Sequence, residues 1–204
     1  AHRLDRLDLT LHSAAAFAAF CAAASAVYLL NDLRDREADR LHPVKCRRPI
    51  AAGELGAGPA IAAALALTAV ALALALRLGR GFLICLAIYL ALNVLYSLAL
   101  KRLVILDVMT IALGFVLRVE AGALAIAVEV SSWLLLCTTF VALFLGFAKR
   151  RHELALQPQS GTGTRSVLEH YNLTFVDQMI NVVTASTIVS YALYPVDPGT
   201  AARL

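Results

Sequence analysis

Three aspartates in the stretch NDLRDREAD are spaced so that they could bind a metal ion together. Asp32, Asp35 and Asp39 are three and four residues apart, so they share one face if the chain is helical there. Asn31 lies beside that face. Carboxylates this close repel one another without a cation, and Mg²⁺ prefers oxygen ligands and substrate phosphates. The spacing predicts a metal–diphosphate site; the alternative is a solvated helix end, because basic residues are interleaved with the acids.

The composition indicates an integral membrane protein. The chain has 204 residues, of which 60% are hydrophobic and 16% charged, and its mean hydropathy is +0.76. The apolar residues occur in long blocks, which excludes an ordinary soluble domain. The four cysteines are scattered without metal-ligand spacing, so they indicate no disulfide framework. The net charge of +4 is modest, and nucleic acid is not an expected partner.

Six segments are long and apolar enough to cross the lipid bilayer as helices. Twenty helical residues cover about 30 Å, which is the thickness of the hydrocarbon core. The predicted spans are Thr10–Leu30, Ala57–Leu76, Phe82–Leu100, Leu103–Ala125, Ser131–Ala148 and Leu173–Tyr194. The sequence therefore predicts an all-α fold, a polytopic membrane helix bundle that forms a single domain over residues 1–204.

The connections between these spans differ in charge, and this difference predicts the orientation in the membrane. Lys and Arg are enriched in the cytoplasmic loops of membrane proteins. Three connections on one side carry twelve Lys and Arg residues, whereas the opposite side carries five. The aspartates follow the first span on the basic side. We therefore expect the site to face the cytoplasm from a plasma or inner membrane.

Other polar residues on the same side are candidates for binding substrate. They are Lys45, Arg47 and Arg48 after the aspartates, Tyr96 and Lys101 near the end of the third span, and Lys149, Arg150 and Glu153 after the fifth. Lys and Arg can hold phosphate oxygens through charge-assisted hydrogen bonds. Each group also has a structural alternative, because interfacial tyrosines and snorkelling cations commonly anchor the ends of membrane helices.

The fourth span contains charged residues in an otherwise apolar segment. Such charges normally face a polar cavity or one another. Asp107 is near the cytoplasmic end and is a candidate for the site. Arg118 lies about 16 Å further along the helix axis, too far to pair with Asp107 directly. Two roles remain open for Arg118: it could bind a ligand, or it could form a salt bridge with Glu120 of a neighbouring subunit in a homo-oligomer.

The motif NDxxDxxxD resembles the first aspartate-rich motif of the UbiA superfamily of membrane prenyltransferases. The stretches YSLALKRLVILDV, GFVLRVEAGA, AKRRHEL and RSVLEHYNLTFVDQ follow it in the order of the decaprenyl-phosphate phosphoribosyltransferase-like branch. The resemblance implies a larger helical bundle with a cytosol-facing cavity. The chain is therefore expected to be truncated at both ends.

One departure from the wider superfamily bears on the donor. Members with aromatic acceptors carry a second aspartate-rich motif in the region of residues 149–170, where this chain is basic instead. The resemblance thus implies transfer of a 5-phosphoribosyl group from phosphoribosyl diphosphate to a polyprenyl (decaprenyl) phosphate. Asp32, Asp35 and Asp39 would be the catalytic residues and would hold Mg²⁺. The alternatives are a prenyltransferase using a prenyl diphosphate and a lipophilic or aromatic acceptor, and a non-enzymatic transporter.

Overall fold

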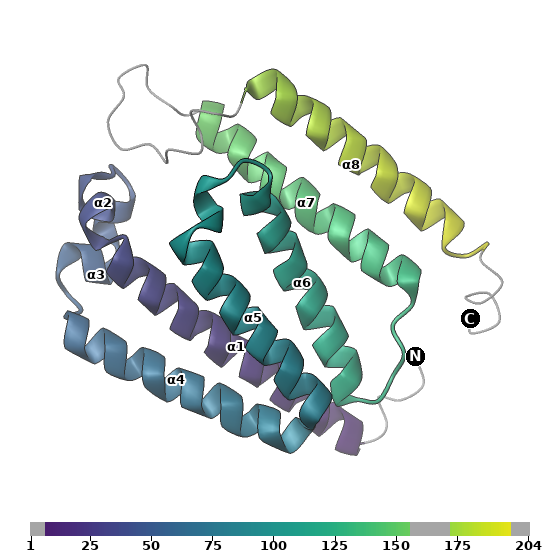
Figure 1. Cartoon of the computed structure of the whole chain (residues 1–204), viewed down its shortest axis with the longest axis horizontal. Helices are drawn as coiled ribbons and strands as arrows, with labels where there is room; N and C mark the ends of the chain where they lie inside the picture. Colours follow the sequence, from purple (N-terminus) through teal and green to yellow (C-terminus); the bar gives the residue numbers. More distant parts are fainter. Residues whose placement is uncertain (1–6, 156–171, 197–204) are drawn as a thin grey trace. The chain divides into compact units, whose positions relative to one another are not determined.

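A computed structural model describes residues 7–155 and 172–196 (Figure 1). All the regular elements of these residues are helices. Six of them, with 19 to 28 residues each, are long and apolar enough to cross a membrane. They are α1 (Leu7–Arg34), α4 (Ala57–Leu78), α5 (Arg80–Leu98), α6 (Leu106–Ala125), α7 (Ser132–Ala155) and α8 (Leu173–Leu193). The prediction of an all-α membrane protein with six spans is confirmed.

Four short helical segments lie between the long helices. They are α2 (Arg36–Leu41), η1 (Lys45–Arg47), α3 (Pro49–Ala52) and η2 (Leu100–Arg102). The first three follow α1 directly, and the predicted site residues Asp39, Lys45 and Arg47 lie in α2 and η1. The fourth separates α5 from α6, where Ile105 has a positive φ of 68°. For this reason α5 ends earlier and α6 begins later than the hydropathy of the sequence predicts.

The described chain divides into two compact units, and each unit is described by itself. The first comprises residues 1–97 and 121–128, and the second comprises residues 98–120 and 129–204. No observation tests the prediction that residues 1–204 form a single domain.

In the first unit, small residues let α1 and α4 pack side by side (Figure 1). The alanines buried on these helices include Ala19, Ala23, Ala60, Ala64, Ala71 and Ala75. Small side chains at helix interfaces allow close packing in lipid, where water exclusion does not drive association. On α1, Phe20 also makes edge-to-face ring contacts with Phe82 and Tyr89 of α5, at centroid distances of 5.6 and 5.3 Å. These contacts fix α1, whose last turn carries the first aspartate.

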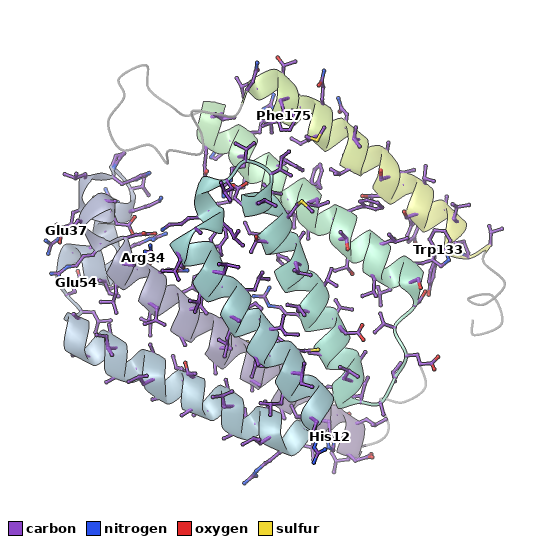
Figure 2. The ribbon with its side chains drawn as sticks, viewed as in Figure 1. His12, Arg34, Glu37, Glu54, Trp133 and Phe175 are labelled. Carbon is purple, nitrogen blue, oxygen red and sulfur yellow. The ribbon has the colours of Figure 1, made fainter. Side chains whose placement is uncertain are left out.

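In the second unit, α7 and α8 form an antiparallel pair. Trp133 near the start of α7 and Phe175 near the start of α8 lie at opposite ends of this pair (Figure 2). A buried cluster of Val108, Phe147, Val176 and Val183 joins α6, α7 and α8. This packing fixes the start of α6 against the end of α7, where the charged candidates of this unit lie.

Candidate functional site

The aspartates lie where α1 passes into α2. Asp35 separates the two helices, with φ −89° and ψ 5°. The helical hydrogen bonds nevertheless continue through it: the Asp35 amide donates to the Asn31 carbonyl at 2.9 Å, and the Asp39 amide donates to the Asp35 carbonyl at 2.8 Å. The helical register is therefore kept, and Asp32 and Asp39 remain on one side as the spacing predicts. In Figure 2, Arg34 and Glu37 mark this end of α1, and His12 marks the other end.

A single guanidinium nitrogen joins two of the three aspartates. Nη1 of Arg48 lies 2.8 Å from Oδ1 of Asp32 and 2.8 Å from Oδ2 of Asp39. The Asp39 side chain is only 6% exposed, whereas the Asp32 side chain is 29% exposed. A carboxylate that is almost buried needs a counter-charge, and Arg48 supplies it.

The chain after Asp39 folds back so that Arg48 can reach the aspartates. Pro49 occupies the first turn of α3, where its fixed φ suits a helix start and its missing N–H is not needed. Gly53 ends α3 in the left-handed conformation, with φ 85°, which glycine adopts without strain. The Arg40 side chain ties α3 to α2, because its Nε donates to the Ala51 carbonyl at 3.2 Å.

The aspartate pair fits a magnesium ion. Its donor atoms are carboxylate oxygens, and Mg²⁺ is commonly held by one or two carboxylates together with substrate phosphates. Arg48 shows that one cationic centre can contact Asp32 and Asp39 together. Within residues 7–155 and 172–196, however, no three His, Cys, Asp or Glu side chains are grouped so that they could hold a metal ion. The site with all three aspartates therefore stays a prediction.

Asn31 is connected to the end of α5. Its side-chain oxygen accepts a hydrogen bond from the Ser97 hydroxyl, which sequence reasoning did not single out. Tyr96 precedes Ser97 and is half-buried. In the loop after α2, Lys45 is half-buried and Arg47 is exposed. The roles predicted for these residues in substrate binding stay predictions.

In the second unit, Arg150 brings two predicted acidic residues together. Its Nε lies 2.7 Å from Oδ2 of Asp107, and its Nη1 pairs with Glu153 one turn further along α7. The side chains of Asp107 and Arg150 are 0% and 1% exposed. The guanidinium thus belongs to a buried ion-pair network between α6 and α7, and its predicted phosphate binding stays untested.

The other candidates of this unit are more accessible. Lys149 is exposed on α7, and Lys101 is half-buried in η2. Because α7 continues to Ala155, the basic cluster that was expected after the fifth span is helical. The neighbouring Arg151 pairs with Asp177 of α8 at 2.6 Å. The sequence did not predict the contact with Asp177, because Arg151 and Asp177 are 26 positions apart and no sequence pattern links them.

Arg118 has an aromatic neighbour on its own helix. Its guanidinium carbon lies 5.1 Å from the centroid of the Phe115 ring, a distance typical of a cation–π contact. A pair with Glu120 of another subunit stays a prediction. Residues 156–171, which include the first half of the stretch RSVLEHYNLTFVDQ, lie outside the described part of the chain.

Comparisons with known proteins agree with this architecture. Residues 5–157 match the sequence model of the UbiA prenyltransferase family. The decaprenyl-phosphate phosphoribosyltransferase of Corynebacterium glutamicum is 40% identical over 90% of this chain. The protein of the same name from Mycolicibacterium smegmatis is 36% identical over 93% of this chain. The chain spans 56% and 60% of the lengths of these two relatives.

The fold is also similar to that of a solved structure. A UbiA homolog from Archaeoglobus fulgidus, bound to GPP and Mg²⁺, superimposes with a TM-score of 0.77 at 22% sequence identity. The match covers 89% of this chain and 65% of the archaeal one. At this identity the similarity concerns the fold alone.

Proposed function

The chain belongs to the UbiA prenyltransferase family, and we propose that the whole protein transfers a 5-phosphoribosyl group from phosphoribosyl diphosphate to a polyprenyl phosphate such as decaprenyl phosphate. The names of the two bacterial relatives support the transferred phosphoribosyl group and the decaprenyl phosphate acceptor. The observation that carries the proposal is the pair of carboxylates, Asp32 and Asp39, held around one cation at the end of a membrane-spanning helix. Such a pair suits the metal-assisted departure of a diphosphate.

In the proposed reaction, the bond between C1 of the ribose and the diphosphate oxygen breaks, and diphosphate leaves with the bonding electrons. A phosphate oxygen of the acceptor forms the new bond to C1. Mg²⁺ bound at the aspartates would neutralise the charge that develops on the leaving group. Asp32 and Asp39, with the predicted Asp35, would hold this ion on the cytoplasmic side.

The residues of the loop after α2 supply positive charge for the donor. Lys45, Arg47 and Arg48 follow the aspartates closely in sequence, and guanidinium and ammonium groups bind phosphate through charge-assisted hydrogen bonds. A general base is not needed, because a phosphate monoester is already ionised at neutral pH. Positioning and electrostatics are therefore sufficient for the reaction. Roles for Lys101, Lys149 and Arg150 in phosphate binding remain predictions of the same proposal.

A second candidate is transfer of a prenyl group from a prenyl diphosphate to a lipophilic or aromatic acceptor. The observation in its favour is the fold shared with the archaeal UbiA homolog that was solved with GPP and Mg²⁺. Both candidates use a diphosphate leaving group and the same first aspartate motif. They are distinguished by the donor.

A transfer assay on the full-length parent protein in lipid separates the two candidates. The protein is incubated with radiolabelled phosphoribosyl diphosphate, polyprenyl phosphate and Mg²⁺, and label is measured in the lipid phase. We expect label to enter the lipid and EDTA to prevent this. Absence of transfer from this donor, together with transfer from a prenyl diphosphate to an aromatic acceptor, would refute the phosphoribosyl proposal.

A further inference from the structure

Arg48 contacts two aspartates at once, the almost buried Asp39 and the half-buried Asp32. Asp32 Oδ1 and Asp39 Oδ2 each lie 2.8 Å from the same nitrogen, so the two oxygens are no further apart than twice that distance. A guanidinium can satisfy two carboxylates in this way because its charge is delocalised and permanent. The pair and Arg48 together carry a net charge of about −1 when the acids are ionised.

The backbone of Arg48 is fixed, whereas its side chain can leave. The Arg48 amide donates to the Lys45 carbonyl at 3.0 Å, and Pro49 follows it. The side chain itself is 43% exposed, although Asp39 is almost buried. The guanidinium therefore reaches Asp39 from the accessible side, and a change of side-chain rotamer can release it without opening the packing of α1 and α4.

We propose that Arg48 is the exchangeable counter-cation of the aspartate pair. It holds Asp32 and Asp39 together before metal binds, and it gives up this position to a divalent cation. Two cations at one carboxylate pair repel each other, so metal binding displaces the guanidinium. The released Arg48 then pairs with a phosphate of the donor. This exchange rests on the proposed role of the two aspartates in metal binding. It gives Arg48 a positioning role that links metal binding to donor binding.

A metal titration without donor tests the exchange. Mn²⁺ serves as the probe, because its free concentration can be followed by electron paramagnetic resonance in the detergent-solubilised full-length parent. We expect Arg48→Gln to bind Mn²⁺ about three- to tenfold more tightly than the wild type, since a partly exposed competing ion pair is removed. The matched control is Arg47→Gln, which removes the same charge from the same loop at an exposed position. We expect a change of less than about twofold for this control, because solvent and salt screen exposed charges.

Thermal unfolding of the same variants separates exchange from a purely structural role. A structural role predicts that Arg48→Gln lowers the melting temperature equally in EDTA and in Mn²⁺. Exchange predicts a larger deficit in EDTA and recovery in Mn²⁺. If Arg48→Gln does not fold, Arg48→Lys takes its place: its more strongly hydrated ammonium is a weaker competitor, so Mn²⁺ affinity still rises above that of the wild type.

The proposal is overturned if Arg48→Gln binds Mn²⁺ no more tightly than Arg47→Gln, or more weakly than the wild type. It is also overturned if the wild type shows no saturable Mn²⁺ binding. Because no donor is present, these results are independent of the reaction. A protein that shows the exchange but transfers no phosphoribosyl group would refute the proposed function and leave the role of Arg48 intact.

Discussion

The Asp107–Arg150 ion pair is almost completely buried, and Glu153 is a second partner of the same guanidinium. Removing a charged group from water is costly, and attraction between the partners offsets this cost only while both are present. Asp107 also lies in the first turn of α6, where the helix dipole favours a negative charge. The pair therefore joins α6 to α7 and holds the basic end of α7 in place.

Asp107→Asn should destabilise the protein far more than the loss of an exposed ion pair. Arg150 would remain buried and would keep its pair with Glu153, so we expect a loss of stability near the low end for broken buried pairs, about 3 kcal/mol. This corresponds to a melting temperature lower by roughly 5–10 °C. Differential scanning fluorimetry of the detergent-solubilised full-length protein measures the effect.

The matched control for this change is Asp177→Asn. It removes the same charge from the Arg151–Asp177 pair, whose side chains are 53% and 46% exposed. Exposed pairs contribute about 0–1 kcal/mol, so the melting temperature should change little. Equal effects of the two variants would show that the buried pair is not a stabilising link.

At the level of residues, the spacing in the sequence was enough to place Asp32 and Asp39 together. A helical face depends only on local periodicity, which is readable from the sequence. The arginine between the two acids could not be predicted, because Arg48 reaches them only after the chain has turned back through α2 and into α3. In the same way, Arg150 was predicted to bind substrate, but nothing local indicated that it would lie against Asp107.

At the level of elements, close approach of α6 and α7 depends on one glycine. A Cβ atom built on Gly146 would lie 2.5 Å from Cγ1 of Val108, which is closer than real Cβ atoms come. Val108 is completely buried and belongs to the core cluster of the second unit. Its side chain therefore has little room to move aside.

Gly146→Ala should lower stability, even though alanine favours helices. Overpacking of a tight core destabilises by about 1–3 kcal/mol, which exceeds the gain of about 1 kcal/mol from helix propensity. Gly122→Ala is the control, because a Cβ atom there meets nothing within 4 Å. Melting temperatures of the two variants check the prediction, and a Gly146→Ala protein at least as stable as Gly122→Ala would contradict it. Adding Val108→Ala to Gly146→Ala should recover part of the packing loss.

The long helices were predictable from hydropathy, whereas their ends were not. Each of the six predicted spans corresponds to a helix, because the bilayer sets the length of the apolar blocks. The end of α7 differs from the prediction, since it continues through the basic cluster to Ala155. Hydropathy falls where charged residues begin, but helical hydrogen bonds do not depend on hydropathy. The start of α6 was predicted too early, because the turn at Ile105 lies within apolar sequence and hydropathy does not reveal it.

At the level of the whole molecule, the charge pattern predicts which end of α1 faces the cytoplasm. Cys46 offers a native probe, because it is half-buried in the short η1 helix that follows the aspartates. A single-cysteine variant that keeps Cys46 should react with a charged maleimide mainly in inverted membrane vesicles, several-fold faster than in right-side-out vesicles. Labelling followed by mass spectrometry measures this. Preferential reaction in right-side-out vesicles would contradict the predicted orientation.

The control for this labelling is a variant that keeps only Cys21. This residue lies near the middle of α1 and is exposed, so it is expected to face lipid in the membrane. A charged reagent does not enter the hydrocarbon core of the bilayer, so it should not reach this thiol. Little labelling in either kind of vesicle would show that the reagent reports on accessibility from water.

The most direct measurement compares phosphoribosyl transfer by the full-length parent protein with that by two variants of α2, Asp39→Asn and Glu37→Gln. Both substitutions remove one acid from the same short helix, but only Asp39 shares Arg48 with Asp32, while the Glu37 side chain is 81% exposed. We predict that Glu37→Gln keeps activity within about twofold. We predict that Asp39→Asn lowers Mg²⁺-dependent transfer at least about a hundredfold, because a metal-stabilised leaving group accounts for several kcal/mol of the barrier. Equal activity of the two variants would contradict the role of the aspartate pair.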